Sequence, residues 1–528
     1  MNEFTKPTIE YFELSPILIV LGVACAGVLV EAFAPRQVRY VIQTLLTLTG
    51  LVAAFVMTVI VGLDLDDVGD AAIGKITAEG AIAVDGPSVF LWGLILLLAI
   101  TSVLLFAERH VDGGVSAFAG QAAALPGTEA ERQASTRGLE HTEVYPLMLF
   151  SVGGMLLFPA GNDLLTMFVA LEILSLPLYL LCGLARRRRL LSQEAAMKYF
   201  LLGAFSSGFF LYGAALVYGY AGSFRFSDIS VAIEGRIGSE GLLLGGIGLV
   251  AVGMLFKIGA APFHAWTPDV YQGAPTAVTA FMAACTKVAA FGALLRIFYV
   301  GFGSARFDWT PMIWIIAVVT MFVGGLLALT QTDVKRMLAY SSIAHAGFLL
   351  TGFVGMYQTN DSDRLSSIQA VLFYLVTYGF MIVAAFAIVT LVRDSGGEVT
   401  SIHRWAGLGK EAPIIAGIFA FLLLGMAGIP LTSGFTGKWA VFASAAQGGA
   451  WPLVVAGVLV SAVAAFFYIR VIVLMFFSEP LSTDAPAVTM PSILTTIVIA
   501  VGFAATVALG VIPGPMLELA GDVGQFIR

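Results

Sequence analysis

The segment GLLLGGIGLVAVGMLFKIGAAPFHAW, residues 241–266, is long and apolar enough to cross a membrane, yet Lys257 lies about halfway through the span. Pro262 follows about one turn later and cannot donate a hydrogen bond to the carbonyl of Ile258, so it tends to break a helix there. Broken helices at membrane depth are tolerated where they line polar cavities. The segment therefore predicts a discontinuous membrane helix with an ionisable side chain beside its break.

The whole chain has the composition of an integral membrane protein. Its 528 residues are 59% hydrophobic and 12% charged, with a mean hydropathy of +0.93, so it has too little polar surface for a soluble globule. The net charge of -7 is spread over short loops, which gives no support to nucleic-acid binding. Cys25, Cys182 and Cys285 lie in apolar segments without metal-like spacing, which favours buried thiols over a disulfide or a cluster.

Hydropathy predicts an all-α, polytopic membrane fold with about 14 transmembrane helices. The first segment has no basic region followed by a cleavage site, so we expect it to be a retained span. An even number of spans places both termini on the same side. The expected span centres are Ala24, Leu51, Leu97, Gly153, Leu174, Leu211, Val250, Ala289, Val319, Phe348, Ile382, Leu423, Ala465 and Val501.

The distribution of basic residues predicts the orientation. The connections on one side hold fourteen Lys and Arg residues, and those on the other side hold seven. By the positive-inside rule the richer side is cytoplasmic, so both termini are expected in the periplasm of a bacterial inner membrane. The richer set comprises Arg36, Arg39, Arg109, Arg132, Arg137, Arg186, Arg187, Arg188, Arg189, Lys335, Arg336, Arg393, Arg404 and Lys410.

Two features of the connections stand out. Residues 109–142 are mostly small and polar without strong periodicity, which indicates a flexible or weakly helical cytoplasmic loop without chemistry of its own. The run Arg186–Arg189 is interpreted as a topology anchor, with a nucleotide or lipid site as the alternative. Arg296 and Arg470, near span ends, are interpreted as interfacial or packing residues.

Ionisable residues inside apolar spans are costly, about 2.5 to 3.5 kcal/mol each on insertion scales, and therefore mark candidate functional positions. Glu172 lies in LLTMFVALEILSLPLYLL, where its alternative role is a structural salt bridge. Lys198 is ambiguous, because Glu194 precedes it by four residues and such a pair near a helix start is common. Lys287 lies in the middle of a span among small residues, which allow close helix packing.

Lys438 follows a second interrupted apolar segment, GMAGIPLTSGFTGKW, in which Gly428 and Pro430 predict another helix break. His345 lies ten residues after Lys335, or about 15 Å along a helix, and either relays protons or bridges helices. His264 follows the break at Pro262, where it either faces the cavity or packs at a helix end.

This array suits proton transfer better than other cargo. Burial disfavours the charged form of an amine or a carboxylate, whereas an opposite charge nearby favours it, so a changing distance between partners can load and release a proton. The excess of lysines disfavours cation binding along the array, and no polar pocket for an organic substrate is apparent. The residues therefore predict a relay of protons between Glu172 and Lys438.

Several segments together resemble the signature segments of the antiporter-like membrane subunits of NADH-quinone oxidoreductase, respiratory complex I. The PFHAWTPDVYQGAPT stretch resembles the N-type members of that family rather than the L or M type, and the likeness covers roughly Tyr145 to Phe477. The segments are VKRMLAYSSIAHAGF, FKIGAAPFHAWTPDVYQGAPT, GIPLTSGFTGKW, LEILSLPLYLL and EAAMKYFLLGAFSSG.

The resemblance implies a domain organisation with two inverted five-helix repeats. Three helices in residues 1–108 and the cytoplasmic loop 109–142 precede the first repeat, 143–302, which is expected to contain the fourth to eighth helices. The second repeat, 303–480, is expected to contain the ninth to thirteenth helices, and the last helix lies in 481–528. Each repeat is expected to contain one of the two discontinuous helices.

The resemblance also implies roles for the ionisable residues. Glu172 is expected to be the key carboxylate, with Lys198 as its partner. Lys257 and Lys438 are the pumping lysines at the two broken helices, and Lys287 links them. Electron transfer from NADH through FMN and iron–sulfur clusters to quinone is expected on partner subunits, and no cofactor is expected on this chain.

The implied partners are other membrane-arm subunits of complex I, including the antiporter-like subunit M and the small subunit K, within the lipid bilayer. Leu431 departs from the family pattern, because a second proline often stands there, and this change is expected to soften the break. A subunit of an Mrp-type proton/cation antiporter is the nearest alternative function. A structural membrane subunit whose lysines only form pairs is another.

Overall fold

A computed structural model describes residues 9–65, 73–112, 114–119, 128–130, 133, 141–236, 238–355, 365–394, 397–479 and 487–527. The fold is almost entirely helical, as predicted, and all fourteen expected span centres fall inside helices. Within the described residues, eleven helices are long and apolar enough to cross a membrane, and α5 and α17 are shorter apolar helices. The α14 helix, whose hydropathy is reduced by polar residues, contains the remaining expected centre, Phe348.

The N-terminal region contains three long helices and a β-hairpin. The hairpin strands pair antiparallel, with Gly74 opposite Asp85 and Thr77 opposite Ile82. The elements are α1 (Ser15–Phe33), α2 (Arg36–Leu63), β1 (Gly74–Thr77), η1 (Ala78–Gly80), β2 (Ile82–Asp85), α3 (Gly86–Phe106) and η2 (His110–Asp112).

The next group of helices contains the first discontinuous helix and a helix with two π-helical turns. Its elements are α5 (Val144–Ala160), α6 (Leu164–Cys182), α7 (Arg189–Ala221), α8 (Phe226–Glu234), α9 (Glu240–Ile258), α10 (Trp266–Gly273), α11 (Thr276–Phe281), η3 (Met282–Thr286), α12 (Lys287–Arg296) and η4 (Ile297–Gly301).

The third group contains the second discontinuous helix and is followed by the C-terminal helices. The strands β3 and β4 form a short hairpin, and β5 pairs with β3. The elements are η5 (Gly303–Ala305), α13 (Arg306–Leu329), α14 (Val334–Phe353), α15 (Ser367–Val389), β3 (Val392–Asp394), β4 (Gly397–Glu398), η6 (Ile402–Trp405), α16 (Leu408–Glu411), α17 (Pro413–Ala427), α18 (Ser433–Gln447), α19 (Trp451–Phe477), β5 (Ala487–Val488), α20 (Ile493–Val511) and α21 (Gly514–Asp522).

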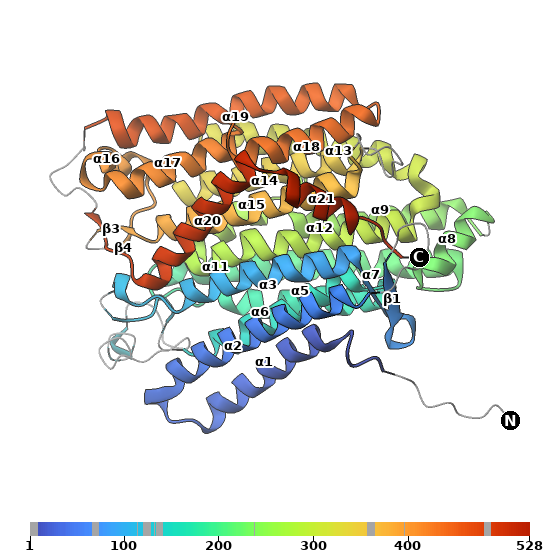
Figure 1. The fold of residues 1–528 in the computed structure, drawn as a ribbon, viewed down its shortest axis with the longest axis horizontal. Helices are drawn as coiled ribbons and strands as arrows, with labels where there is room; N and C mark the ends of the chain where they lie inside the picture. The colour runs from blue at the N-terminus through green and yellow to red at the C-terminus, as the bar shows by residue number, and fades with distance from the viewer. Residues whose placement is uncertain are drawn as a thin grey trace.

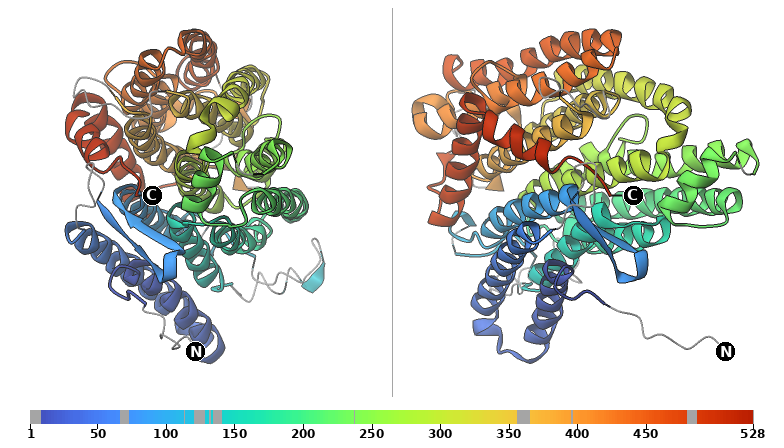
Figure 2. Two further views of the ribbon diagram at one scale, coloured as in Figure 1. Left: turned by 90° about the vertical axis from the view of Figure 1, so that its right-hand side faces the viewer. Right: turned by 45° about the vertical axis from the view of Figure 1, so that its right-hand side comes forward.

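The helices form one bundle, and segments from the middle of the sequence lie in its interior. The α1–α2 pair lies along one edge and α19 along the opposite edge (Figures 1 and 2). Between them, the run from α11 to η4 is buried along its whole length and α15 is buried almost as completely. The C-terminal α20 packs against α15, α18 and α3, so it joins the N-terminal helices to the third group.

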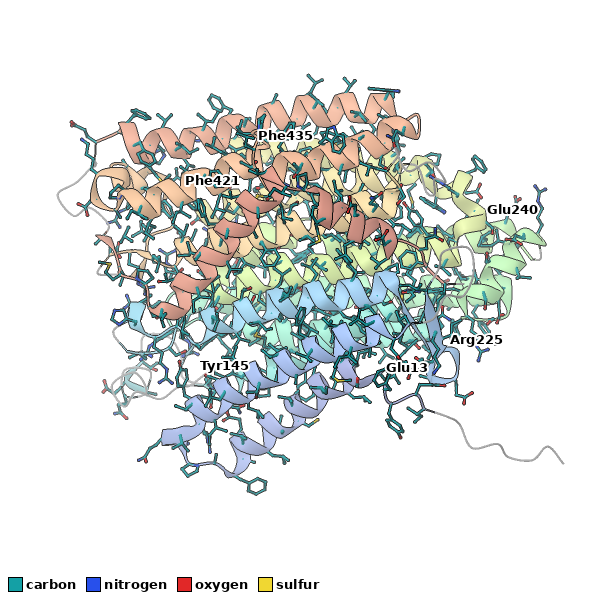
Figure 3. The ribbon with its side chains drawn as sticks, in the orientation of Figure 1. Glu13, Tyr145, Arg225, Glu240, Phe421 and Phe435 are labelled. Atoms are coloured by element: carbon teal, nitrogen blue, oxygen red, sulfur yellow. The ribbon has the colours of Figure 1, made fainter. Side chains whose placement is uncertain are left out.

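The ends of the helices alternate as expected for successive membrane crossings. Figure 3 shows Glu13, before α1, and Glu240, at the start of α9, towards one end of the bundle, where Arg225 also lies. Tyr145, at the start of α5, lies towards the other end. Three crossings separate the start of α1 from the start of α5, and three more lead to the start of α9, so this placement fits the predicted order of spans.

The first helix break is confirmed, although a glycine ends the helix before the predicted proline. The α9 helix stops at Ile258, and Gly259 adopts a left-handed conformation with φ +74°. Its amide and that of Ala260 donate to the carbonyls of Phe256 and Leu255, a common helix ending that glycine adopts without steric cost. Pro262 lies in the segment between α9 and α10, joined to Ala261 by a cis peptide bond.

The second break is also confirmed, and the helix is interrupted there although leucine instead of proline stands at position 431. The α17 helix stops at Ala427, Gly428 adopts φ +87°, and α18 begins at Ser433. Leu431 itself adopts φ +70°, a left-handed conformation that costs a non-glycine residue about 1 to 2 kcal/mol. The halves α17 and α18 are located in Figure 3 by Phe421 and Phe435.

The two breaks occupy equivalent positions, since each discontinuous helix is the fourth helix of its expected five-helix group. A group of five spans begins and ends on opposite sides of the membrane, so two consecutive groups have inverted orientations. The boundaries 143–302 and 303–480 themselves remain predictions. The loop at 109–142 lies partly outside the described residues, and within its described part Phe118 pairs with Ala185.

Three basic residues that were assigned to connections are buried in the fold. Lys335 is the second residue of α14, Arg189 is the first residue of α7, and Arg393 lies in β3. Lys335 and Arg189 differ from the prediction because hydropathy locates the apolar core of a span better than its ends, whereas Arg393 does lie in the connection between α15 and α16. Arg470, near the end of α19, donates to the carbonyl of Leu329 at 3.1 Å, which agrees with its predicted packing role.

Arg296 and Asp85 form a fully buried ion pair that joins distant parts of the chain. The Nη2 atom of Arg296 lies 2.6 Å from Oδ1 of Asp85, and both side chains have no exposed surface. Arg296 also donates to Ser88 and to the carbonyl of Pro159. Asp85 accepts hydrogen bonds from the amides of Ser88 and Ile527. One ion pair therefore connects α3, α5, α12 and the C-terminal segment.

Replacing Asp85 by Ala is expected to destabilise the fold by about 3 to 5 kcal/mol, because it leaves the buried Arg296 charge without its partner. Thermal inactivation of the purified, assembled complex measures the effect. The double variant Asp85→Leu/Arg296→Met removes both charges and is expected to be more stable than Asp85→Ala. A double variant less stable than the single one would show that the pair is not the source of the effect.

Candidate functional site

Lys257 lies at the end of α9, beside the first helix break, and its side chain is 4% exposed. Its Nζ atom donates to Oγ of Ser175 at 2.8 Å and to the hydroxyl of Tyr199 at 2.9 Å. Ser175 belongs to α6 and Tyr199 to α7. Three helices therefore meet at the Lys257 amine, which is bound by two neutral oxygens.

Glu172 lies on α6, three residues before Ser175, so both side chains lie on the same side of that helix. The charges of Glu172 and Lys257 interact electrostatically. The Oε1 atom of Glu172 is buried and has no hydrogen-bond partner among the described residues. The structure thus brings Glu172 and Lys257 into one electrostatic pair without a direct hydrogen bond.

Lys198 forms its ion pairs with Glu194 and Asp269, whereas the family resemblance implies a partnership with Glu172. Its side chain is 42% exposed, and its Nζ atom lies 2.7 Å from both Glu194 and Asp269. Within the described part of the chain, no ion pair joins it to Glu172. The reason is geometric, since Lys198 is adjacent to Tyr199 on α7 and neighbouring residues on a helix face directions about 100° apart. Tyr199 faces Lys257, so Lys198 points elsewhere.

Asp269 is a functional candidate that the sequence analysis did not single out. It lies on α10, after the first break, where it contacts Lys198 of α7. Its other oxygen lies 2.6 Å from Arg336 of α14, which also donates to Gln272 at 3.1 Å. The only signal for it in the sequence was a carboxylate close to a predicted helix break. Asp269 therefore ties the short α10 helix to its two neighbours.

An aromatic stack connects this short helix to the Lys257 site. The ring of Trp266, at the start of α10, stacks on Tyr199 with centroids 4.6 Å apart and an interplanar angle of 13°. The indole nitrogen of Trp266 donates to the carbonyl of Phe256, next to Lys257. The position of α10 is therefore coupled through Trp266 to the tyrosine that binds the lysine amine.

Lys287 begins α12, directly after the π-helical turn η3, and is 5% exposed. Its Nζ atom donates to the carbonyl oxygen of Ser342 at 2.6 Å and to its Oγ at 2.7 Å. Among the described residues it has no carboxylate partner. Single π-helical turns occur often at functional sites, where they shift side chains relative to a regular helix.

His345 lies one turn after Ser342 on α14 and is 1% exposed. Its Nδ1 atom lies 2.7 Å from the hydroxyl of Tyr374, and its Nε2 atom lies 3.4 Å from that of Tyr468. His345 interacts electrostatically with both Lys287 and Lys438. It is thus located between two of the predicted relay lysines.

Lys438 lies on α18, just after the second break, and is 4% exposed. Its Nζ atom donates to the carbonyls of Met426 at 3.0 Å and Ala427 at 2.9 Å, and to Oγ of Ser461 at 2.8 Å. The two carbonyls end α17, where the break leaves them without helical partners and where the helix dipole is negative. The break therefore provides the acceptors for the buried amine.

The other supporting residues lie within the breaks. Pro262 and Pro430 are exposed, whereas His264 is partly buried. The Nδ1 atom of His264 is enclosed and has no hydrogen-bond partner in the described part of the chain. The described residues bring no group of three or more His, Cys, Asp or Glu side chains together as metal ligands.

The family comparison agrees with the segments that carry the resemblance. Residues 161–465 match the family model described as NADH:quinone oxidoreductase/Mrp antiporter, TM, which covers more than half of the chain. NADH-quinone oxidoreductase subunit N of Nocardioides sp. is 65% identical over 532 residues, with 100% of each chain covered. The subunit N of Rhodococcus opacus is 58% identical, with 99% of this chain and 97% of that protein covered.

Solved structures show the same fold. A chain of respiratory complex I from Thermus thermophilus with bound aureothin is 34% identical, with a TM-score of 0.75, and 96% of this chain and 100% of that chain are covered. A chain of the Mrp complex from Dietzia sp. has a TM-score of 0.78 over 97% of each chain at 20% identity, which shows the fold alone. The chain therefore belongs to the subunit N family of NADH-quinone oxidoreductase, within the antiporter-like membrane subunits.

Proposed function

We propose that this chain moves protons across the membrane as a membrane-arm subunit of NADH-quinone oxidoreductase. The observation that carries the proposal is the set of three buried lysines, Lys257, Lys287 and Lys438, whose amines are bound by neutral oxygens. A buried amine without a carboxylate in contact can exchange its proton when a neighbouring charge changes. Glu172 supplies such a charge at Lys257, and His345 lies between the other two lysines.

In this proposal the driving force comes from other subunits. Electron transfer from NADH through FMN and iron–sulfur clusters to quinone takes place on partners, and this chain binds none of these cofactors. The partners are membrane-arm subunits including the antiporter-like M and the small subunit K. The chain lies in a bacterial plasma membrane, the inner membrane where there are two, with both termini in the periplasm, as the surplus of basic residues in one set of connections supports.

The remaining predicted residues have supporting roles. Pro262 and Pro430 keep the two breaks open, and His264 lines the first break. Lys198 acts in the proposal through Asp269, because its amine contacts that carboxylate instead of Glu172. It thereby holds α10, whose Trp266 packs on Tyr199, in position beside Lys257.

An Mrp-type proton/cation antiporter subunit is the alternative that the shared fold favours. Two observations separate the functions. Genes for other NADH dehydrogenase subunits beside this gene would support the complex I assignment. Uptake that depends on sodium in place of protons would favour the antiporter.

Replacing Lys257 by Gln is expected to lower proton pumping at least about tenfold, because removal of a positioned proton carrier typically costs 10²- to 10⁴-fold. The measurement compares NADH-driven acidification of membrane vesicles with quinone reduction by the assembled complex. The control is Lys410→Gln, which removes an exposed lysine. Assembled Lys257→Gln complex with normal pumping would favour the structural-subunit alternative.

Gly428→Ala tests the contact between the second break and Lys438. A Cβ atom at Gly428 would lie 3.0 Å from Cδ and 3.2 Å from Nζ of Lys438, so the amine is expected to shift and pumping to fall several-fold. Gly449→Ala is the matched control, because Gly449 has φ +84° and open space around its Cβ position. Alanine is strained at both positions, because both glycines have positive φ. Equal losses of pumping in the two variants would therefore show that this strain, and not a displaced Lys438, causes the loss.

Lys198→Gln separates a positioning role from a place in the relay. Because the Lys198 amine is 42% exposed and bound to Glu194 and Asp269, its loss is expected to reduce pumping less than Lys257→Gln does. Glu194→Gln, which removes only the exposed partner, is expected to have a smaller effect still. A loss as complete as that of Lys257→Gln in the same vesicle assay would place Lys198 in the relay itself.

A further inference from the structure

Hydroxyl groups from two neighbouring helices meet the imidazole of His345. The α14 helix, which contains His345, packs against both α15 and α19 (Figure 1). The Nδ1 atom of His345 lies 2.7 Å from the hydroxyl of Tyr374 on α15, and its Nε2 atom lies 3.4 Å from the hydroxyl of Tyr468 on α19. The Tyr468 hydroxyl also forms a hydrogen bond with Oγ of Ser341, one turn before His345. Both ring nitrogens therefore have a hydroxyl partner.

The partners in this cluster can exchange protons. Ser341, Tyr374 and Tyr468 are all buried, so their hydroxyls bond to protein groups in the interior of the bundle. A hydroxyl and an imidazole can each donate and accept a hydrogen bond. By contrast, the buried hydroxyl of Tyr220 donates to the backbone carbonyl of Ala232, which only accepts. The cluster around His345 is therefore chemically able to pass a proton from one member to the next.

The members of the cluster lie at successive depths in the bundle. Because successive spans alternate in direction, α14 begins at the end of the bundle where α15 and α19 stop. At 1.5 Å per residue, Ser341 lies about 11 Å from that end, Tyr468 about 14 Å and His345 about 17 Å. Tyr374 lies about 23 Å from the same end, since it stands fifteen residues before the last residue of α15. The cluster thus extends across the membrane and not only within its plane.

Two more buried hydroxyls lie beyond Tyr374, towards the other end of the bundle. Ser367 stands two turns before Tyr374 on the same face of α15. Ser444 stands two turns after Gly437 on α18, and Gly437 faces Tyr374, because a Cβ atom there would lie 2.6 Å from Cδ2 of the tyrosine. The Oγ atoms of both serines have no hydrogen-bond partner among the described residues. The seam between α15 and α18 therefore offers hydroxyls to which a water molecule can bind.

We propose that Tyr468 and Tyr374 carry protons to and from His345, so that a branch across the membrane meets the row of lysines at this histidine. This inference rests on the proton-pumping function proposed above. With its own proton on Nδ1, His345 accepts a proton at Nε2 from Tyr468, which is reprotonated through Ser341 from the side where α14 begins. The Nδ1 proton then passes to Tyr374, whose hydroxyl proton moves to water in the α15–α18 seam. One proton enters, one leaves, and the imidazole is neutral again in its other tautomer.

The lysines determine when His345 can take up a proton. His345 interacts electrostatically with both Lys287 and Lys438. Two ammonium charges nearby oppose the formation of an imidazolium, so proton uptake is favoured when one lysine has lost its charge. Transfer through the branch is therefore coupled to the protonation of the relay.

The test uses Tyr374→Phe and Tyr468→Phe, each of which removes one hydroxyl and keeps the buried ring. Each variant is expected to lower NADH-driven proton pumping per assembled complex at least about tenfold, because a positioned proton carrier typically contributes 10²- to 10⁴-fold. Pumping is measured in vesicles in H₂O and in D₂O. The solvent isotope effect is expected to increase, because proton transfer through the interrupted branch then limits the rate. A loss of pumping with an unchanged isotope effect indicates a merely structural role and overturns the proposal.

The matched control is Tyr220→Phe, which also removes a buried tyrosine hydroxyl, but one that donates to the carbonyl of Ala232 at 3.2 Å. Normal pumping in the control, together with losses in both cluster variants, supports the proposal. Wild-type pumping in either cluster variant overturns it, and so does an equal loss in the control. If a cluster variant does not assemble, Ser341→Ala is a smaller change that removes the partner of Tyr468, and unaltered pumping then refutes the branch.

The Lys257→Gln variant separates this inference from the function on which it rests. Normal pumping by assembled Lys257→Gln complex contradicts the proton-pumping function itself. A loss of pumping in Lys257→Gln, combined with wild-type pumping in Tyr374→Phe and Tyr468→Phe, refutes only the branch through His345.

Discussion

A lysine amine buried among membrane helices requires oxygen atoms, and the fold is arranged to provide them. In a regular helix the backbone carbonyls bond to amides, so they are not available to a buried amine. The break after Ala427 releases carbonyls at the end of α17, and Lys438 binds two of them. The glycine that ends the helix also leaves room for the lysine side chain. Helix discontinuity and lysine burial are therefore two aspects of the same constraint.

The two breaks meet this constraint differently. Lys257 precedes its break and binds only hydroxyl groups, from α6 and α7, whereas Lys438 follows its break and binds two backbone carbonyls of the preceding half-helix besides one hydroxyl. Hydroxyl acceptors can rotate, so the environment of Lys257 adapts more easily than that of Lys438. Glu172, the partly buried carboxylate that interacts with Lys257, lies in this adaptable half. A change in charge is therefore more easily accommodated at the first break.

The sequence predicted the architecture well because hydropathy and helix breaking are local properties. All fourteen span centres lie in helices, and both interruptions were recognised from prolines and glycines. The direction of Lys198 was not predictable in this way, because hydropathy reveals that a residue lies in a span but not which face it occupies. The role of Asp269 depends on Lys198 and Arg336, which lie far from it in the sequence. The left-handed conformation of Leu431 also had no signal, since leucine does not favour it.

The α14 helix connects the parts of the molecule that the sequence analysis treated separately. Lys335, near its start, donates to the carbonyl of Ala274 in the α10–α11 junction, and Ser342 and His345 lie further along the same helix in contact with the relay. The ten residues from Lys335 to His345 span about 15 Å in a regular helix. Because both positions lie on one regular helix, the contacts that hold Lys335 against Ala274 and Thr276 also help to set the position of Ser342 beside Lys287.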